Sequence, residues 1–213
     1  MSPAYTLVLD LDETLIHFVS SMANEDSNLE DLEDGENDFF YMVRPFCNKF
    51  LTELCKYYEL VIFTAAMQDY ADWIVDGIDH RGTISHRLYR QHCSKSTAET
   101  DGEIEQGFKS IKDLNLLGRD ITKTIIIDNL KENFLTTTPD NGIEIVSWYG
   151  DDLEDSELDK LIPFLKAIAV NEEKDVRQVI KAYRENIQDY TAKMLPEPAA
   201  QKQDYKRKFF SSY

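Results

Sequence analysis

Short apolar runs alternate along this chain with stretches whose apolar residues recur at steps of three and four. The runs predict strands, which we place at 5–10, 39–43, 59–64, 87–90, 123–128 and 143–146. The helical spacing predicts helices, which we place from Pro45 through Tyr58, over 68–78 and over 155–169. This alternation is typical of an α/β fold with a parallel sheet and helices on both faces.

The inward face of the helix that Pro45 opens is a set of large apolar side chains. We expect it to consist of Phe46, Phe50, Leu51, Leu54 and Tyr58. The other two predicted helices show the same spacing, so each is expected to cover the sheet with one apolar side.

Residues 171–195 carry a further amphipathic pattern. Its apolar positions are Val176, Ile180, Tyr183, Ile187, Tyr190 and Met194. We predict an additional helix that packs back on the 1–170 domain, with docking to a protein partner as the alternative. The residues after it, 196–213, form a basic tail with Lys202, Lys206, Arg207 and Lys208.

Two polar stretches interrupt the pattern of strands and helices. Eight acidic side chains lie between Glu25 and Asp38, and no Lys or Arg precedes Arg44. A segment with so few apolar residues cannot offset its ordering entropy, so we expect an acidic mobile loop over 19–38. The polar stretch 94–107 is expected to be a surface excursion.

Carboxylates stand where the first strand leaves the predicted sheet. Asp10 and Asp12 end the apolar run that includes Leu7, and Thr14 follows. A buried carboxylate is disfavoured unless a cation or hydrogen-bond donors compensate it, so the pair points to a metal or to phosphate chemistry. The plain alternative is that both acids cap a turn.

Other polar residues mark the ends of later strands. Thr64 ends the second core strand, and Asp128 and Asn129 end the third, with Lys112 between them in the sequence. Ligands of an open parallel sheet bind beyond the carboxyl ends of its strands, so these side chains are expected to converge there.

With these residues the chain resembles the haloacid dehalogenase-like (HAD) phosphotransferases. Within them it is similar to the small phosphatases of the RNA polymerase II C-terminal domain and to the NLI-interacting-factor-like family. The likeness spans about 5–168 and is carried by 9–17, 43–45, 63–66, 70–72, 87–90, 112–114, 117–120, 127–129 and 147–149. It implies a HAD-like Rossmannoid sheet for the 1–170 domain.

The resemblance also implies a mechanism. Asp10 would be the nucleophile that forms an aspartyl-phosphate, and Asp12 would serve first as general acid and then as general base. Mg²⁺ would be held by Asp10, by the backbone carbonyl of Asp12 and by Asn129, with Asp128 in support. A cation is needed because nucleophile and phosphate are both negative.

The remaining motif residues are assigned to the phosphate and its surroundings. Thr64 and Lys112 would bind the transferring phosphoryl group. Thr14 and Arg90 would support the first motif loop and contact the phosphate or the substrate. A purely structural role is the alternative for each of these four residues.

The class of substrate that we expect depends on whether the insertions between the strands hold a cap domain. Many HAD enzymes of small metabolites carry a cap domain, whereas the gap 15–38 is short and charged and the gap 65–111 is mainly helix and loop, so no large cap is expected. An open site suits phosphoserine or phosphothreonine on a protein segment, with the RNA polymerase II C-terminal domain as one candidate. Phe18 and the long 94–107 stretch depart from the family pattern.

Two other function classes stay open. One is a non-catalytic binding or scaffold protein on the same fold, which would resemble the mitochondrial import receptor. The retained motif residues argue against it. The other is a small-metabolite phosphatase or phosphomutase, which the expected lack of a cap disfavours.

Composition and charge restrict the partners and the compartment that we expect for this chain. The net charge of −17 would repel a phosphate backbone, so no direct nucleic-acid binding is expected. No apolar run approaches the roughly eighteen residues of a membrane helix, so we expect no membrane segment in this chain. An odd number of cysteines without a Cys-x-x-Cys pair fits a reducing, intracellular compartment, nucleus or cytoplasm. We read as ordinary core or surface residues Cys47, Cys55, Cys93, His80, His86 and His92.

Overall fold

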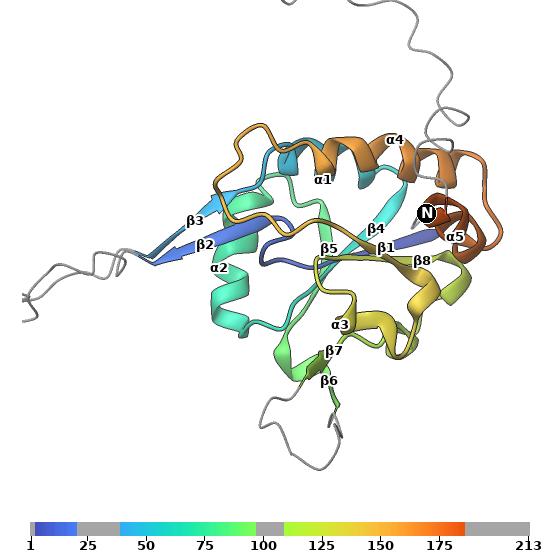
Figure 1. The fold of residues 1–213 in the computed structure, drawn as a ribbon, viewed down its shortest axis with the longest axis horizontal. Coiled ribbons are helices and arrows are strands. Elements are labelled where there is room, and N and C mark those ends of the chain that lie inside the picture. The colour runs from blue at the N-terminus through green and yellow to red at the C-terminus, as the bar shows by residue number, and fades with distance from the viewer. Residues whose placement is uncertain (1–2, 21–38, 97–108, 186–213) are drawn as a thin grey trace, which may run out of the picture.

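The computed structural model describes residues 3–20, 39–96 and 109–185. Within them a five-stranded sheet is formed by β1 (Tyr5–Leu9), β4 (Tyr58–Phe63), β5 (Ile84–Leu88), β8 (Thr124–Asp128) and β9 (Gly142–Glu144). Its order is β5-β4-β1-β8-β9, and each neighbouring pair is parallel (Figure 1). The predicted α/β architecture with a parallel sheet is therefore confirmed.

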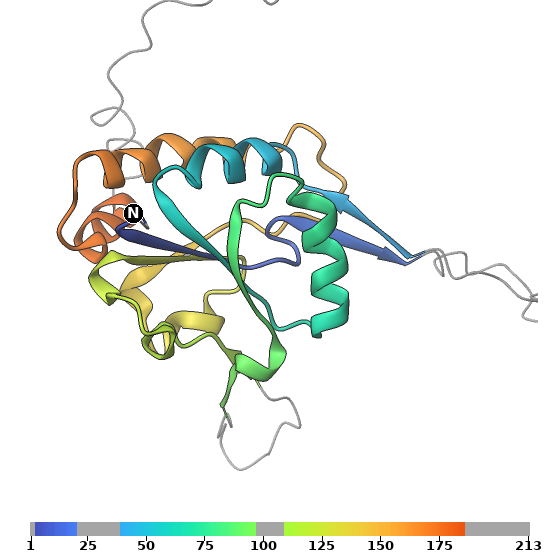
Figure 2. The ribbon, with the colours of Figure 1, turned by 180° about the vertical axis from the view of Figure 1, so that it is seen from behind.

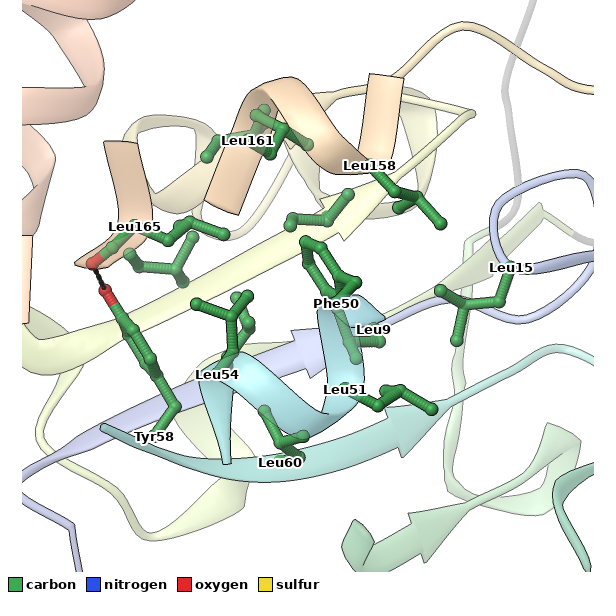
Figure 3. Close-up of a cluster of buried hydrophobic side chains, with 14 of the residues drawn as sticks. Leu9, Leu15, Phe50, Leu51, Leu54, Tyr58, Leu60, Leu158, Leu161 and Leu165 are labelled. Carbon is green, nitrogen blue, oxygen red and sulfur yellow. Dashed lines mark hydrogen bonds between the residues drawn. The ribbon is translucent and has the colours of Figure 1, made fainter. Parts of the chain in front are cut away.

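One face of the sheet carries the main hydrophobic core. Leu9 of β1 and Leu60 of β4 point to this face, where four helices cover them. The covering helices are α1 (Cys47–Leu54), α2 (Gln68–Ile78), α4 (Glu157–Val170) and α5 (Val176–Glu185). Figures 1 and 3 show α1 and α4 side by side above the strands, where the Tyr58 hydroxyl donates to the Leu165 carbonyl over 2.7 Å.

The opposite face has a smaller core. Alternate strand residues such as Val8 and Ile126 pack there against Phe134 of α3 (Glu132–Leu135) and Leu114 of a short 3-10 helix (Leu114–Leu117). Figure 2 shows the arrangement from behind. Helices therefore cover both faces, as predicted, but unequally, because the helices described on the second face are short.

Three details of the predicted elements were wrong. Phe46 does not belong to the inward face of α1: its φ of 64° turns it out of the helix, which begins at Cys47, and it is 44% exposed. Tyr58 is buried, but as the first residue of β4. The strand expected at 87–90 lies instead at Ile84–Leu88, because Arg90 begins a 3-10 turn.

An antiparallel hairpin follows the first motif. It joins β2 (Ile16–Ser20) to β3 (Phe39–Val43). The acidic loop expected over 19–38 was placed too early, since Val19 and Ser20 belong to β2, and residues 21–38 lie outside the described part. A second antiparallel ribbon is formed by β6 (Ser94–Ser96) and β7 (Lys109–Ile111). Residues 97–108 between these strands also lie outside the described part of the chain.

These insertions bear on the predicted lack of a cap. The described part of the first insertion is the β2–β3 ribbon. The described part of the second contains the β6–β7 ribbon, together with α2 and β5, which belong to the main body. Among the described residues, neither insertion forms a second domain. None of the described helices is long and apolar enough to cross a membrane.

The described part of the C-terminal helix packs on the main core. Val176, Val179 and Ile180 of α5 are buried, and the Tyr183 ring stacks on Phe164 with centroids 4.2 Å apart. The predicted packing of this helix against the domain is confirmed for these residues. The rest of the helix predicted over 171–195, and the basic tail, lie beyond the described ranges.

A substitution in α5 tests how much this packing contributes to the stability of the domain. Because Ile180 has no exposed surface, Ile180→Ala should lower the free energy of unfolding by about 2–5 kcal/mol in urea titrations. The neighbouring exposed Lys181 provides the control, and Lys181→Ala should change it by less than about 0.5 kcal/mol. Equal stability of the two variants would show that α5 is not part of the core.

Candidate active site

The register of the sheet brings the motif residues to one edge. Leu9 pairs with Ile62 on one side and with Ile127 on the other. The residues that follow at this level, Asp10 and Asp128, are therefore neighbours, and the Asp10 amide continues the ladder by donating to the Ile127 carbonyl over 3.0 Å. Thr64 follows β4 at the same carboxyl edge, so the predicted convergence of the strand ends is observed.

A buried lysine joins the two strand-end carboxylates. The Lys112 ammonium lies 2.5 Å from Asp10 Oδ1 and 2.7 Å from Asp128 Oδ2. The side chains of Lys112 and Asp128 have no exposed surface, and that of Asp10 is 9% exposed. Two carboxylates around one ammonium leave an excess negative charge in a region from which water is largely excluded.

The pKa values of this cluster follow from burial and from that charge count. Burial raises the pKa of Asp10 to about 7, with Asp128 adding to the effect and Lys112 opposing it. Burial alone would lower the pKa of Lys112, but Asp10 and Asp128 outweigh it and hold that pKa above its usual value. Lys112 is therefore a fixed positive charge, whereas ionised Asp10 needs further compensation.

Asp128 is anchored by a residue that sequence reasoning missed. Asn133 of α3 donates through Nδ2 to Asp128 Oδ1 over 3.0 Å, and its carbonyl accepts the Lys112 amide over 2.7 Å. The Leu130 amide also donates to Asp128 Oδ1 over 2.8 Å. Asp128 and Lys112 are thus tied to the same turn of chain, which keeps both charges beside Asp10.

Thr14 lies between a carboxylate oxygen of Asp10 and the amide oxygen of Asn129. Its hydroxyl is 3.4 Å from Asp10 Oδ2 and 3.4 Å from Asn129 Oδ1. Asn129 is oriented through Nδ2, which donates to Ser147 Oγ over 3.0 Å and leaves its carbonyl oxygen toward Thr14. A carboxylate and an amide oxygen on either side of a hydroxyl are hard donors of the type that Mg²⁺ prefers.

The Asp12 side chain contacts α2. The Tyr70 hydroxyl of α2 donates to Asp12 Oδ1 over 2.5 Å, and Phe18 packs edge-on against the Tyr70 ring with centroids 5.4 Å apart. Burial, and then the contact with Asp12, raise the pKa of Tyr70 well above its usual range, so the phenol stays a donor. Tyr70 lies in a segment that carries the family likeness, yet nothing in its sequence position pointed to Asp12.

Thr64 and Arg90 lie on the turn that follows β4. Thr64 is buried, and its hydroxyl oxygen accepts the Ala66 amide over 2.9 Å. Arg90 is exposed and donates from Nε to the Ala65 carbonyl over 2.7 Å. Among the described residues neither side chain hydrogen-bonds to the Lys112 cluster, so their roles toward a phosphate stay predictions.

Of the cysteines, Cys93 lies beside this edge, where its thiol donates to the Thr64 carbonyl over 3.7 Å and burial raises its pKa. Cys47, the first residue of α1, lies in the core, where burial, with a contribution from Asp79, raises its pKa to about 12, so it is not a thiolate near neutrality. All three cysteines are free. No group of three or more His, Cys, Asp or Glu side chains in the described ranges is arranged to hold a metal. The predicted ligand set does not require one, since it has one carboxylate, one amide and one backbone carbonyl.

Comparison with known sequences extends the likeness described above. A family model for NLI interacting factor-like phosphatases matches residues 5–177, which reaches beyond residue 168 into α5. CTD small phosphatase-like protein 3 of Caenorhabditis elegans is 37% identical over 183 residues, which are 84% of this chain and 59% of that protein. Human carboxy-terminal domain RNA polymerase II polypeptide A small phosphatase 2 is 33% identical over 165 residues, 76% of this chain and 56% of that protein.

This chain thus spans less than two thirds of the length of these relatives. Among solved structures, that of Fcp1, an essential RNA polymerase II CTD phosphatase, aligns with a TM-score of 0.48 and 21% identity. The alignment covers 92% of this chain and 55% of that one.

The raised pKa of Asp10 predicts a pH-dependent loss of stability. Unfolded Asp10 ionises near pH 4 and folded Asp10 near pH 7, so its contribution to stability is complete below about pH 4 and is lost as the pH rises through about 7. In a chelating buffer, Asp10→Asn should therefore gain stability relative to the unmodified chain between pH 4 and pH 8.

Urea titrations across this pH range provide the measurement. The control is Asp140→Asn, because Asp140 is exposed at the opposite edge of the sheet, just before β9. This control should show no such trend. If Asp10→Asn were less stable than the unmodified chain at pH 8, the burial argument for Asp10 would be wrong.

Proposed function

Because this chain belongs to the NLI interacting factor-like phosphatase family, we propose that it is a Mg²⁺-dependent protein phosphatase that acts on phosphoserine or phosphothreonine through an aspartyl-phosphate. The observation that carries the proposal is the buried pairing of Lys112 with Asp10 and Asp128. A nucleophile, a fixed positive charge and a pair of hard oxygens meet there at one edge of the sheet.

In the first half-reaction an Asp10 carboxylate oxygen attacks the phosphorus in line with the ester oxygen. The new bond is Asp10 O–P, and the bond that breaks joins phosphorus to the serine or threonine oxygen. Asp12 gives its proton to that leaving oxygen. Lys112 offsets charge on Asp10 and on the equatorial phosphoryl oxygens without changing its own protonation.

In the second half-reaction water attacks the phosphorus of the aspartyl-phosphate. Asp12 takes a proton from that water, the Asp10 O–P bond breaks, and inorganic phosphate leaves. Asp12 thus returns to its protonated state, and Asp10 becomes a carboxylate again. Tyr70, which donates to Asp12 in the structure, would release or reorient this carboxyl group when substrate binds.

The residues present fit a magnesium ion. The excess negative charge of the buried cluster and the oxygens on either side of Thr14 suit a hard cation, which the Asp10 carboxylate, the Asp12 carbonyl and the Asn129 amide oxygen would hold. When bound, Mg²⁺ lowers the repulsion between the carboxylate and the phosphate. Asp128 supports the site through its hold on Lys112.

Residues around the site support a class of substrate. Thr64 would donate to the phosphoryl group, and the exposed Arg90, whose Nε donates to the Ala65 carbonyl, would present its terminal nitrogens to an anionic group of the substrate. Among the described residues neither insertion forms a cap domain, and an open site suits a phosphorylated protein segment. The human relative carries the carboxy-terminal domain of RNA polymerase II in its name, so that domain is one candidate substrate. We propose that this chain acts in the nucleus or the cytoplasm.

Loss of the nucleophile tests the mechanism. The purified chain should hydrolyse an aryl phosphate with Mg²⁺ and stop when a chelator is added. Asp10→Asn should lower kcat by roughly a thousandfold or more, because the amide lacks the carboxylate oxygen that would take the phosphoryl group. Asp140→Asn, with the same chemical change at an exposed site, should keep its kcat. Turnover that survives in Asp10→Asn would exclude the covalent route.

A substrate panel separates the proposal from its two alternatives. Phosphoserine and phosphothreonine peptides, including polymerase repeat peptides, should be hydrolysed with at least about tenfold higher kcat/KM than sugar phosphates, since binding beyond the phosphate adds transition-state stabilisation. Faster turnover of sugar phosphates would favour a small-metabolite enzyme. Peptide binding without turnover of any ester would favour a scaffold.

A further inference from the structure

Arg44 is a buried charge that the proposed chemistry does not use. It follows β3, and its side chain has no exposed surface. A guanidinium group keeps its charge at any ordinary pH, so burying it demands that its donors be satisfied. The groups that the Arg44 donors contact therefore indicate the role of this residue.

One side of the guanidinium group is fixed by a carboxylate before α4. Arg44 Nε lies 2.9 Å from Asp155 Oδ1, and Nη2 lies 2.8 Å from Asp155 Oδ2. Two parallel bonds of this kind set the plane of the group as well as its position. Asp155 is anchored in turn, because its Oδ1 accepts the Glu157 amide in the first turn of α4 over 3.2 Å.

The remaining donor points at the first motif loop. Arg44 Nη1 lies 3.2 Å from the Thr14 carbonyl and 3.5 Å from the Glu13 carbonyl, and the Arg44 amide donates to the Leu15 carbonyl over 3.0 Å. One residue thus contacts three successive carbonyls of the loop that begins at Asp10.

That loop has a conformation which needs outside support. Glu13 has a φ of 56°, in the left-handed region that is strained for a residue other than glycine. Its carbonyl is held by Arg44 and also by the Trp148 amide, which donates over 3.0 Å. The turn therefore persists because neighbours from β3 and from the chain before α4 fix its carbonyls.

The position of this turn sets the position of the reacting groups. Thr14, whose carbonyl Arg44 holds, places its hydroxyl beside Asp10 Oδ2 and Asn129 Oδ1. The Asp12 carbonyl, one of the proposed metal contacts, belongs to the same turn. A displacement of the turn would therefore move the Asp12 carbonyl, a proposed metal contact, and the Thr14 hydroxyl relative to Asp10.

We infer that Arg44 is a positioning residue, which holds the Glu13–Thr14 turn so that the Asp12 carbonyl and the Thr14 hydroxyl face the nucleophile and the metal. The inference rests on the proposed function for its catalytic consequence, but the hold on the turn is a property of the free protein. A purely stabilising role explains less, because a buried ion pair adds little net stability and the spare donor would not need to point at this loop.

The variant that tests the inference is Arg44→Lys. Lysine keeps the charge, but a single ammonium cannot make the paired bonds to Asp155 and reach the loop carbonyls at the same time. The matched control is Lys49→Gln. It removes the Lys49 to Asp159 ion pair of 2.6 Å, which links α1 to α4 at the exposed surface and touches no motif residue.

Three readouts are measured on each protein. Hydrogen exchange without metal reports the Trp148 amide, which is bonded to the Glu13 carbonyl. Calorimetric titration with Mg²⁺ reports metal affinity, and aryl phosphate turnover gives kcat and KM. In Arg44→Lys, Trp148 exchange should rise about tenfold, metal affinity should fall about fivefold, and kcat should fall tenfold or more with KM within about twofold. Lys49→Gln should match the unmodified chain.

The outcomes are separable. Unchanged Trp148 exchange and metal affinity in Arg44→Lys would overturn the inference, as would a lower kcat that only follows the folded fraction. If Arg44→Lys does not fold, Asp155→Asn, which loses one of the two bonds to Arg44, should show the same changes at smaller size, and wild-type values would overturn the inference. If the unmodified chain has no phosphatase activity, the proposed function fails, while Trp148 exchange still decides whether Arg44 holds the turn.

Discussion

The structure depends on one ammonium group placed between two buried carboxylates. Lys112 contacts Asp10 and Asp128 at the ends of neighbouring strands, and none of the three could be buried there alone without a large cost. Together they still carry one excess negative charge. Burial and the neighbouring Asp128 raise the pKa of Asp10, and the negative charge of the ionised cluster is what a divalent cation would offset in the proposed chemistry.

The surrounding fold supplies rigidity to this cluster from three directions. The parallel register fixes Asp10 beside Asp128, α3 contributes Asn133 to hold Asp128 and Lys112, and the chain before α4 reaches back through Asp155 and Arg44 to the Glu13–Thr14 turn. The apolar packing of α1, α4 and α5 on the sheet keeps these supports in place. Residues far from the edge therefore set the geometry of the groups at it.

The sequence predicted the sheet and the strand-end residues because both depend on local patterns. Apolar runs mark the buried strands, and parallel topology places Asp10, Thr64 and Asp128 at one edge. It could not predict contacts that depend on side-chain packing, such as Tyr70 with Asp12 or Arg44 with Asp155. An arginine at the end of an apolar strand was the one available signal. Phe46 was misplaced because its left-handed backbone leaves no trace in helical spacing.

Trapping the covalent intermediate tests the central claim most directly. Asp12→Asn should still form the aspartyl-phosphate from 4-nitrophenyl phosphate, whose leaving group needs no proton, but should hydrolyse it slowly. Rapid mixing with Mg²⁺ should then release one nitrophenolate per protein in a burst, and borohydride reduction after the burst should convert Asp10 to homoserine, as detected by peptide mass. Turnover with no burst and with Asp10 unmodified would contradict the assignment of Asp10 as the nucleophile.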